Sequence, residues 1–317
     1  MLLSLAMLVA GLVLLVFAGD YLVKGAVGLA ENFNIPPLII GLTIVAFGTS
    51  APELMVSLNS ALTGVPDIAI GNIVGSNIAN VLLVMGLPAL IMAIPADQRG
   101  LSRNVAVMLV FTLVFMWMMN DGVITRIEGG ILFAGLCIYI GEQILRARKI
   151  MGQGSDDAVH DYHDDIGEAP HSTGTIALYL IGGLIALPIA AHLTVSGASG
   201  IARIFGVSDA AIGLTVVAVG TSLPELAATL MAAWRKSGDV ALGNIIGSNI
   251  FNIAAIIGIT GLIIPVPVAA SMISYDMWVM LGAGILLAVL CFAKITTGKV
   301  IGSAMLVAFA AYIVSVF

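Results

Sequence analysis

Residues 41–80 have the sequence GLTIVAFGTSAPELMVSLNSALTGVPDIAIGNIVGSNIAN, and residues 213–252 have the sequence GLTVVAVGTSLPELAATLMAAWRKSGDVALGNIIGSNIFN. Aligned without gaps at an offset of 172 residues, the two stretches are identical at 23 of 40 positions. Each copy places one glutamate, Glu53 or Glu225, in an otherwise apolar run, directly after a proline. Because a charge is costly in an apolar run of membrane length, such a residue indicates a functional site. Its duplication indicates a transporter with an ion site near the bilayer midplane.

The composition indicates a protein surrounded by lipid. The chain has 317 residues, of which 60% are hydrophobic and 9% charged, with a mean hydropathy of +1.13. Soluble domains carry about 25% charged residues, so this much apolar surface requires a lipid bilayer as its solvent. The net charge of −6 gives no support for nucleic-acid binding. Cys137 and Cys291 lack the spacing of a disulfide framework or a metal site, and we expect no cofactor.

Membrane spans are predicted from apolar runs of about 20 residues. Ten segments qualify: 2–30, 36–62, 67–93, 102–120, 125–147, 174–202, 208–234, 239–264, 274–292 and 298–316. Five of them precede a central polar stretch and five follow it. We therefore predict an all-α membrane protein with ten transmembrane helices.

The distribution of basic residues predicts the topology. If the central loop is cytoplasmic, ten of the 12 lysines and arginines lie on the inner side, as the positive-inside rule favours. Both termini then lie outside the inner membrane, and the odd number of spans in each half gives the halves opposite orientations. The predicted organisation is a first five-helix repeat over 1–150, a cytoplasmic acidic loop over 151–173, and a second, inverted five-helix repeat over 174–317.

The acidic loop also contains three histidines, His160, His163 and His171. Such a composition is typical of a solvated linker. Histidines interleaved with acids also fit a metal sensor that adjusts transport, and the sequence leaves both interpretations open.

The proline before each glutamate predicts a break in its helix. Pro52 and Pro224 have no N–H to donate to the carbonyls of Gly48 and Gly220, four residues earlier. Irregular backbone at membrane depth is tolerated only where protein buries it or where it lines a wet cavity. Helices 2 and 7 are therefore expected to be broken at the ion site, with backbone carbonyls free to bind a cation.

Residues that bear oxygen ligands share a helix face with each glutamate. The two sets have the same spacing: Ala46, Thr49, Ser50 and Glu53 in the second span, and Ala218, Thr221, Ser222 and Glu225 in the seventh. The third and eighth spans carry polar residues at i, i+4 and i+8: Asn72, Ser76 and Asn80, and Asn244, Ser248 and Asn252. Hydroxyl, amide, carbonyl and carboxylate oxygens suit Na⁺, Ca²⁺ or Mg²⁺. Because two ionised carboxylates are costly to bury empty, a carrier that reorients only when loaded would act as an antiporter.

These motifs resemble those of the Ca²⁺/cation antiporter superfamily, in its sodium/calcium exchanger branch. The matching segments are GTSAPEL at 48–54, GNIVGSN at 71–77, GTSLPEL at 220–226 and GNIIGSN at 243–249. The resemblance covers the whole chain. It implies a functional monomer that exchanges Na⁺ for Ca²⁺ electrogenically, with two aqueous paths that converge on one ion cluster.

The resemblance also implies roles for individual residues. Glu53 and Glu225 would bind Ca²⁺ and share the Na⁺ sites, and the carbonyls of Thr49 and Thr221 would complete the Ca²⁺ site. Two Na⁺ sites would be lined by Ser50, Ser76 and the Ala46 carbonyl, and by Ser222, Ser248 and the Ala218 carbonyl. Asn80 and Asn252 would lie between them, and some relatives carry aspartate in place of Asn252.

Other functions remain open from the residues alone. H⁺/Ca²⁺ exchange is the nearest alternative, although Gly75 and Gly247 stand where proton/calcium exchangers typically carry a glutamate, which favours Na⁺. A cation channel is the second alternative, and inverted halves suit alternating access better than a static pore. We expect no enzyme activity, since the chain has no H-E-x-x-H motif and no evident pair of nucleophile and base.

Overall fold

The computed structural model describes residues 1–153, 170, 172–206 and 218–316, which are helical apart from short connections and one pair of strands. Most of the expected acidic loop over 151–173, including its three histidines, lies outside the described residues.

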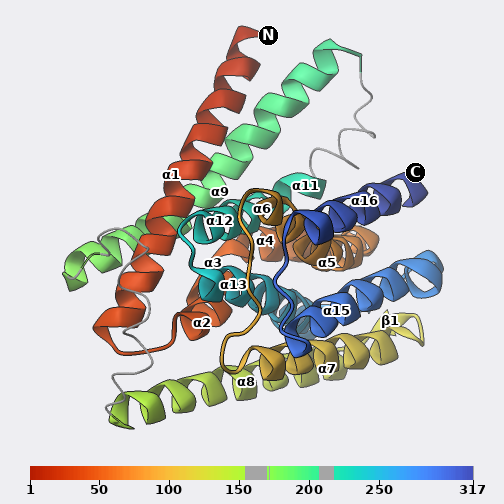
Figure 1. Cartoon of the computed structure of the whole chain (residues 1–317). Coiled ribbons are helices and arrows are strands. Elements are labelled where there is room, and N and C mark those ends of the chain that lie inside the picture. The colour runs from red at the N-terminus through yellow and green to blue at the C-terminus, as the bar shows by residue number, and fades with distance from the viewer. Residues whose placement is uncertain (154–169, 171, 207–217, 317) are drawn as a thin grey trace.

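The first half of the chain begins with the long helix α1 and ends with α8 (Figure 1). Its elements are α1 (Leu2–Asn32), α2 (Pro37–Ile40), the π-helical segment η1 (Gly41–Val45), α3 (Ala46–Thr49), α4 (Ala51–Leu62), α5 (Pro66–Ala79), the π-helical segment η2 (Asn80–Val84), α6 (Gly86–Ile91), α7 (Leu101–Met119), β1 (Val123–Ile124) and α8 (Arg126–Gln153).

The second half repeats much of this order. Its elements are α9 (Thr173–Ile204), α11 (Ala218–Thr221), α12 (Leu223–Trp234), α13 (Gly238–Phe251), the π-helical segment η6 (Asn252–Ile257), α14 (Gly258–Ile263), β2 (Val266–Pro267), the π-helical segment η7 (Met272–Asp276), α15 (Met277–Phe292) and α16 (Lys299–Val316). The strands β1 and β2 pair antiparallel and join a connection of one half to a connection of the other.

The described helices match nine of the ten membrane spans predicted from the sequence. In the described part of the chain, eight helices are long and apolar enough to cross a membrane, and the bent pair Pro37–Thr49 and Ala51–Leu62 is a ninth candidate. The other expected span, 208–234, is described only from Ala218 onward, as α11 and α12. The all-helical membrane fold is confirmed, and the count of ten spans remains a prediction.

Two helices are interrupted at a serine. Ser50 separates α3 from α4, and the chain bends there by 43°. Ser222 separates α11 from α12 in the same way. Pro52 and Pro224 fall in the first turn of the helices that follow, where a backbone donor has no intrahelical partner to lose. Each proline therefore starts the second part of a broken helix.

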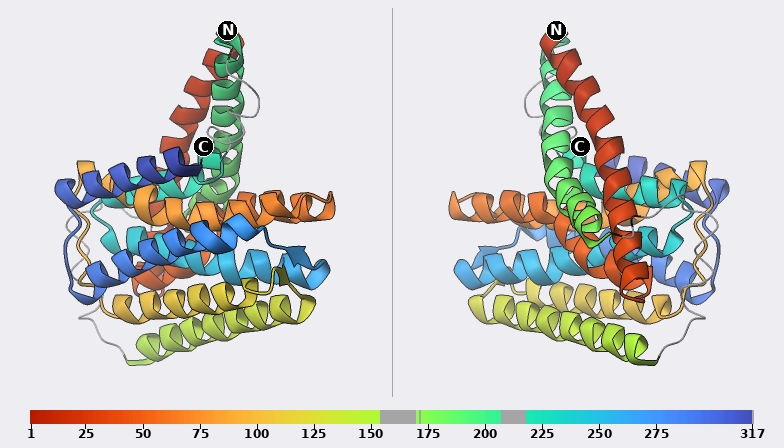
Figure 2. Two further views of the ribbon diagram at one scale, coloured as in Figure 1. Left: turned by 90° about the vertical axis from the view of Figure 1, so that its right-hand side faces the viewer. Right: turned by 90° about the vertical axis from the view of Figure 1, so that its left-hand side faces the viewer.

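The long helices α1 and α9 lie antiparallel and side by side, and they cross the other helices steeply (Figure 2). Glycines make this contact close. A Cβ at Gly183 would lie 2.8 Å from the Cβ of Leu22, and a Cβ at Gly197 would lie 2.4 Å from the backbone nitrogen of Leu8. Small residues let membrane helices approach each other in this way, so α1 and α9 form one closely packed unit.

Asp20 ties this helix pair to α12. Its carboxylate pairs with Lys24, 3.0 Å away on the same helix, and with Arg235 at the end of α12. The i,i+4 spacing predicts the first pair, whereas the second joins residues that are 215 positions apart.

The helix α13 lies at the centre of the molecule, and all 14 of its residues are buried. Its Gly243 and Gly247 pack against the backbone of Leu38 and Leu42 in α2 and η1. The motif of the second repeat is thus pressed against the broken helix of the first.

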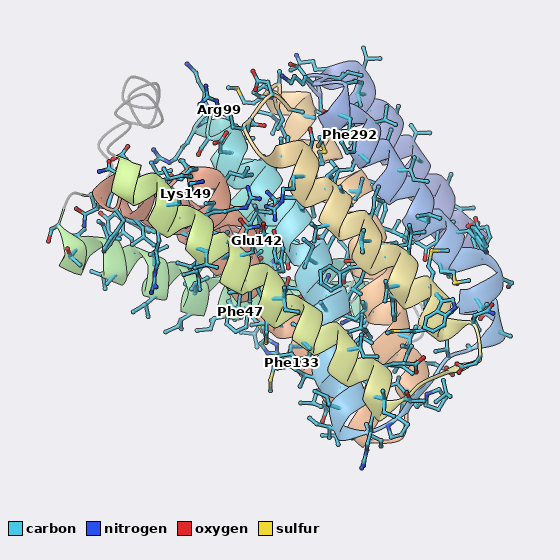
Figure 3. The ribbon with its side chains drawn as sticks, turned by 90° about the horizontal axis from the view of Figure 1, so that it is seen from below. Phe47, Arg99, Phe133, Glu142, Lys149 and Phe292 are labelled. Carbon is cyan, nitrogen blue, oxygen red and sulfur yellow. The ribbon has the colours of Figure 1, made fainter. Side chains whose placement is uncertain are left out.

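The helix α8 covers one face of the molecule beside α7 (Figure 3). Its Glu142 pairs with Arg146 on the same helix, at 2.9 Å, and with Arg103 on α7. The adjacent Gln143 is buried and donates a hydrogen bond of 2.7 Å to the Oδ1 atom of Asn104 on α7. Polar contacts therefore fix α8 against the rest of the first half.

The contact between α1 and α9 can be tested with two adjacent glycines of α9. Gly183→Ala should lower the melting temperature in detergent, because its methyl group would lie 2.8 Å from the Cβ of Leu22 and 3.0 Å from the carbonyl oxygen of Ala18. Overpacking of this kind costs about 1–3 kcal/mol. Gly182→Ala is the matched control, since its methyl group would meet no described atom within 4 Å. Equal melting temperatures for the two variants would contradict the packing described above.

Candidate ion-binding site

Two glutamates form the centre of the candidate site. Glu53 and Glu225 each lie in the first turn after a helix break, and both are 0% exposed. Among the described residues, both carboxylate oxygens of Glu53 and the Oε2 atom of Glu225 have no hydrogen-bond partner. The Oε1 atom of Glu225 accepts one hydrogen bond of 3.0 Å from the hydroxyl of Ser50. Buried carboxylates with so few partners are costly, and a bound cation would offset that cost.

Asn72 anchors the helix turn that carries Glu53. Its amide nitrogen donates to the backbone carbonyl of Glu53 at 3.3 Å and to the hydroxyl of Ser57 at 3.0 Å. Its Oδ1 atom accepts a hydrogen bond of 3.5 Å from Thr221 of the other repeat. One side chain therefore joins α5, the first glutamate and the second broken helix.

Asn244 makes the same contacts in the second repeat. Its amide nitrogen donates to the backbone carbonyl of Glu225 at 3.3 Å and to the hydroxyl of Thr229 at 3.0 Å. Its Oδ1 atom accepts a hydrogen bond of 3.1 Å from Thr49. The two asparagines thus link the repeats in both directions, each to a threonine of the other copy.

Thr49 connects further members of the predicted set. Its hydroxyl lies 3.4 Å from the hydroxyl of Ser248 and 3.3 Å from the carbonyl oxygen of Ala46. The Ala46 carbonyl also accepts a hydrogen bond of 3.1 Å from the backbone nitrogen of Ser50. This carbonyl, expected to bind Na⁺, is therefore engaged within its own helix.

Asn80 and Asn252 occupy equivalent positions at the starts of η2 and η6. The amide nitrogen of Asn80 donates to the Oδ1 atom of Asn249 at 3.4 Å, and that of Asn252 donates to the Oδ1 atom of Asn77 at 3.2 Å. Both asparagines are 0% exposed, and their own Oδ1 atoms have no hydrogen-bond partner in the described part of the chain. Single π-helical turns within α-helices frequently occur at functional sites.

The structure brings several of the residues predicted for the site into direct contact. Direct contacts join Ser50 to Glu225 and Thr49 to Ser248. Ser222 and Ser248 are buried, as is Ser76 on α5. Ala218 is the first residue of α11.

Six buried oxygen atoms of the predicted residues have no hydrogen-bond partner among the described residues. They are both carboxylate oxygens of Glu53, the Oε2 atom of Glu225, the Oγ atom of Ser222, and the Oδ1 atoms of Asn80 and Asn252. Over the same residues no group of three or more His, Cys, Asp or Glu side chains could hold a metal. A cation here would therefore depend on two carboxylates and neutral oxygens, a donor set that suits hard cations.

Sequence reasoning did not assign roles to four asparagines that the structure brings into the network. The spacing predicts the helix face of Asn72 and Asn244, and close helix packing brings that face against the glutamates, but neither predicts the atoms that they contact. Asn77 and Asn249 are predicted only as part of the motif. Their repetition in GNIVGSN and GNIIGSN is the signal that could have indicated them.

The chain is similar in sequence to known membrane proteins. The family model described as sodium/calcium exchanger protein matches residues 3–145 and 175–317. The inner membrane protein YrbG of Escherichia coli (strain K12) is 38% identical over 296 residues, which cover 93% of this chain and 90% of that protein. The sodium/calcium exchanger MaX1 of Methanosarcina acetivorans is 32% identical over an alignment of 312 residues, and the alignment covers 88% of this chain and 89% of that protein.

A solved structure of the sodium–calcium exchanger NCX_Mj, soaked with zero Na⁺ and Ca²⁺, resembles the fold with a TM-score of 0.84. The sequence identity is 33%, and the match covers 100% of this chain and 99% of that one.

The asparagine anchors can be tested by removing one of them. Asn244→Leu should lower the melting temperature, because it removes the hydrogen bonds of Asn244 to the Glu225 carbonyl, to the Thr229 hydroxyl and to the Thr49 hydroxyl. Each buried polar group left unsatisfied costs about 1–3 kcal/mol. Asn59→Leu, at an exposed position of α4, is the control. A melting temperature for Asn244→Leu that equals the control value would contradict the anchoring role.

Proposed function

Since the chain belongs to the sodium/calcium exchanger protein family, we propose that it exchanges Na⁺ for Ca²⁺ across the membrane by alternating access, electrogenically. The chain is a membrane protein, and its family and fold support a cation/Ca²⁺ antiporter. The proposal adds Na⁺ as the counter-ion and the cell inner membrane as the location.

The observation that carries this proposal is the pair of buried carboxylates. Three of their oxygens, together with one oxygen each from Ser222, Asn80 and Asn252, have no hydrogen-bond partner among the described residues. Ca²⁺ takes six to eight oxygen ligands at about 2.3–2.6 Å in tolerant geometry. Several Na⁺ ions would offset the same two negative charges. The donor set thus fits both cargo ions and offers no soft ligand for a transition metal.

The proposed roles follow the two repeats. Glu53 and Glu225 bind Ca²⁺ and share the Na⁺ sites, and the carbonyls of Thr49 and Thr221 complete the Ca²⁺ site. The remaining ligands of the two Na⁺ sites are Ser50, Ser76 and the Ala46 carbonyl in one, and Ser222, Ser248 and the Ala218 carbonyl in the other. Asn80 and Asn252 lie between the two sites.

Obligatory exchange follows from the charge at the site. Two ionised carboxylates without a cation are costly to carry through a closed state, so the protein reorients only when it is loaded. Such a carrier exchanges ions and does not leak them. In the proposed movement, α1 and α9 slide as one unit against the cluster on the broken helices, α5 and α13.

The proposed architecture has ten helices in two inverted five-helix repeats, 1–150 and 174–317, joined by the cytoplasmic loop over 151–173. Both termini lie outside and the monomer is the functional unit. The two matched segments of the family model, 3–145 and 175–317, support this division.

The function is tested by Ca²⁺ uptake into proteoliposomes loaded with Na⁺ and diluted into Na⁺-free buffer, with an ionophore clamping the pH. We expect uptake that requires the outward Na⁺ gradient and responds to membrane potential. Uptake that ignores Na⁺ but follows an imposed pH gradient would instead establish H⁺/Ca²⁺ exchange. Voltage-driven flux without any counter-ion would indicate a cation channel.

The two glutamates are tested by substitution with glutamine, which keeps their shape and removes their charge. Glu53→Gln or Glu225→Gln should abolish exchange and weaken Ca²⁺ binding by about 100-fold or more, since loss of one partner of a buried charge pair costs about 3–5 kcal/mol and 1.4 kcal/mol is a factor of ten. Glu31→Gln, at a partly exposed position of α1, should transport normally. Substantial Na⁺-driven uptake by either of the first two variants, inserted at normal levels, would refute the site.

A further inference from the structure

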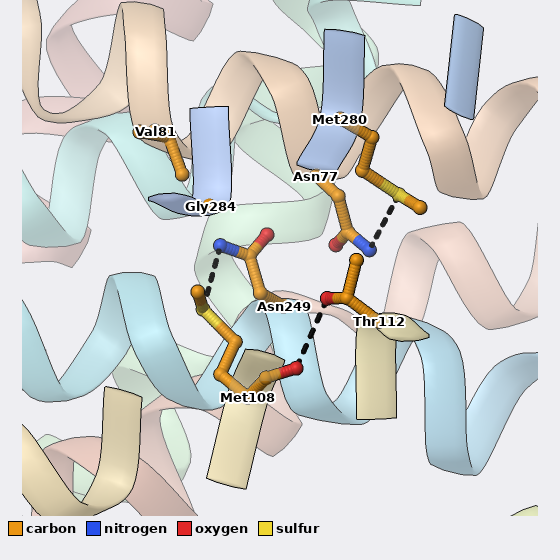
Figure 4. Close-up of a pocket in the computed structure, with 7 residues that line it drawn as sticks. All are labelled: Asn77, Val81, Met108, Thr112, Asn249, Met280 and Gly284. Atoms are coloured by element: carbon orange, nitrogen blue, oxygen red, sulfur yellow. Dashed lines mark hydrogen bonds between the residues drawn. The ribbon is translucent and has the colours of Figure 1, made fainter. Parts of the chain in front are cut away.

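A second polar layer adjoins the asparagines of the candidate site. Asn77 on α5 and Asn249 on α13 each contact the sulfur of a methionine, Met280 on α15 and Met108 on α7 (Figure 4). The two methionines are separated by 172 residues, which is also the offset of the sequence repeat. Both are nearly fully buried. Each contact therefore joins the two halves of the chain, and the repeat offset relates one contact to the other.

A thioether sulfur fixes the direction of the first amide in this layer. It can accept a hydrogen bond but has no proton to donate. The amide nitrogen of Asn77 accordingly faces the sulfur of Met280, at 3.7 Å. Its Oδ1 atom is turned the other way and accepts the hydrogen bond of 3.2 Å from Asn252. Asn252 thus donates from its amide nitrogen to Asn77, and its Oδ1 atom has no hydrogen-bond partner among the described residues.

A second, equivalent chain of contacts runs from Met108 through Asn249 to Asn80. The amide nitrogen of Asn249 lies 3.6 Å from the sulfur of Met108, and its Oδ1 atom accepts the hydrogen bond of 3.4 Å from Asn80. The Oδ1 atom of Asn80 is again left without a partner among the described residues. If any one of these amides were rotated by 180°, two donors or two acceptors would face each other and a hydrogen bond would be lost.

The space between the two chains is small. A cavity of about 10 Å³ is lined by Asn77, Val81, Met108, Thr112, Asn249, Met280 and Gly284. This volume is about that of one water molecule, so the amides have little room for other partners. The two sulfurs are the acceptors that the fold itself supplies at the outer end of each chain.

The orientation of Asn80 and Asn252 matters for cation binding. An asparagine can offer a site either its carbonyl oxygen, which attracts a cation, or its NH₂ group, which repels one. We propose that Met108 and Met280 are positioning residues, which hold the two amide chains so that Asn80 and Asn252 present oxygen to the transported cation. This inference rests on the proposed function of the site, since it assumes that Asn80 and Asn252 face the ions.

The first test replaces each sulfur with a carbon of similar volume. Met108→Leu and Met280→Leu should raise the half-saturating concentrations of Na⁺ and Ca²⁺ about two- to threefold, with little change in maximal rate. This is the factor by which a weak hydrogen bond, of the kind that a thioether accepts, biases an equilibrium. Met118→Leu on α7 and Met277→Leu on α15 are matched controls, because both methionines are buried in the same helices. Half-saturating concentrations equal to those of the controls would overturn the proposal.

A second test separates orientation from packing. In Asn252→Asp, studied at a pH at which the new carboxyl group is ionised, the side chain at position 252 has no donor. The carboxylate then attracts the amide nitrogen of Asn77, and the oxygen of Asn77 turns toward Met280, which cannot donate. Met280→Leu should therefore lower the melting temperature of the ion-free protein less in the Asn252→Asp background than in the native background. If Met280 only fills space, Met280→Leu should lower the melting temperature equally in the two backgrounds, and that result would overturn the proposal.

The two tests also distinguish this inference from the proposed function. The melting temperatures are measured without Na⁺ or Ca²⁺, so they report the amide chains even if the native protein shows no Na⁺-driven Ca²⁺ uptake. Failure of uptake by the native protein counts against the proposed function. The melting temperatures could show that the effect of Met280→Leu depends on residue 252 while the methionine variants bind Na⁺ and Ca²⁺ as the native protein does. That result would overturn the proposed role of the methionines in cation binding.

Discussion

The interaction on which the rest of the structure depends is the repulsion between two carboxylates buried where water cannot screen them. Glu53 and Glu225 are fully buried, yet hydrogen bonds from the described residues satisfy only one of their four oxygens. The two motifs that carry these glutamates also carry hydroxyl and amide side chains that can supply oxygen ligands. Breaks at Ser50 and Ser222 start a new helix directly before each glutamate, so the carboxylates lie near helix N-termini, where negative charge is stabilised.

Much of this arrangement is encoded by local sequence. Apolar runs predict the spans, and the prolines predict the broken helices, because both features depend on nearest neighbours along the chain. The contact between Asn72 and Thr221 is not encoded in this way: helical spacing places each residue on a face but does not name the residue opposite. The pairing of Asp20 with Arg235 was missed for the same reason. The π-helical starts at Asn80 and Asn252 were also missed, since the i→i+5 hydrogen bonds have no simple residue signature.

The duplicated motif is not used identically in the two halves. Ser50 donates a hydrogen bond to Glu225, whereas the hydroxyl of Ser222 has no partner among the described residues. Thr112 lines the small cavity beside the asparagines, and its counterpart at the repeat offset is Gly284. A sequence repeat therefore predicts which residues take part in the site, but it does not predict their contacts in a given conformation. Alternating access requires such a difference, because two related repeats can produce two conformations only if their contacts are not the same.

The hydrogen bonds that cross between the repeats have a consequence for how the protein is made. Asn72, Asn77, Asn244 and Asn249 each complete their bonding with a side chain of the other copy. Ribosomes deliver the first copy to the membrane well before the second, since synthesis runs at about 5–20 residues per second. The helices of the first copy are therefore in the bilayer for some time before the partners of their buried amides have been synthesised. The amides of the first copy are therefore satisfied only after the elements of the second copy that carry Thr221, Asn252 and Met280 have been inserted.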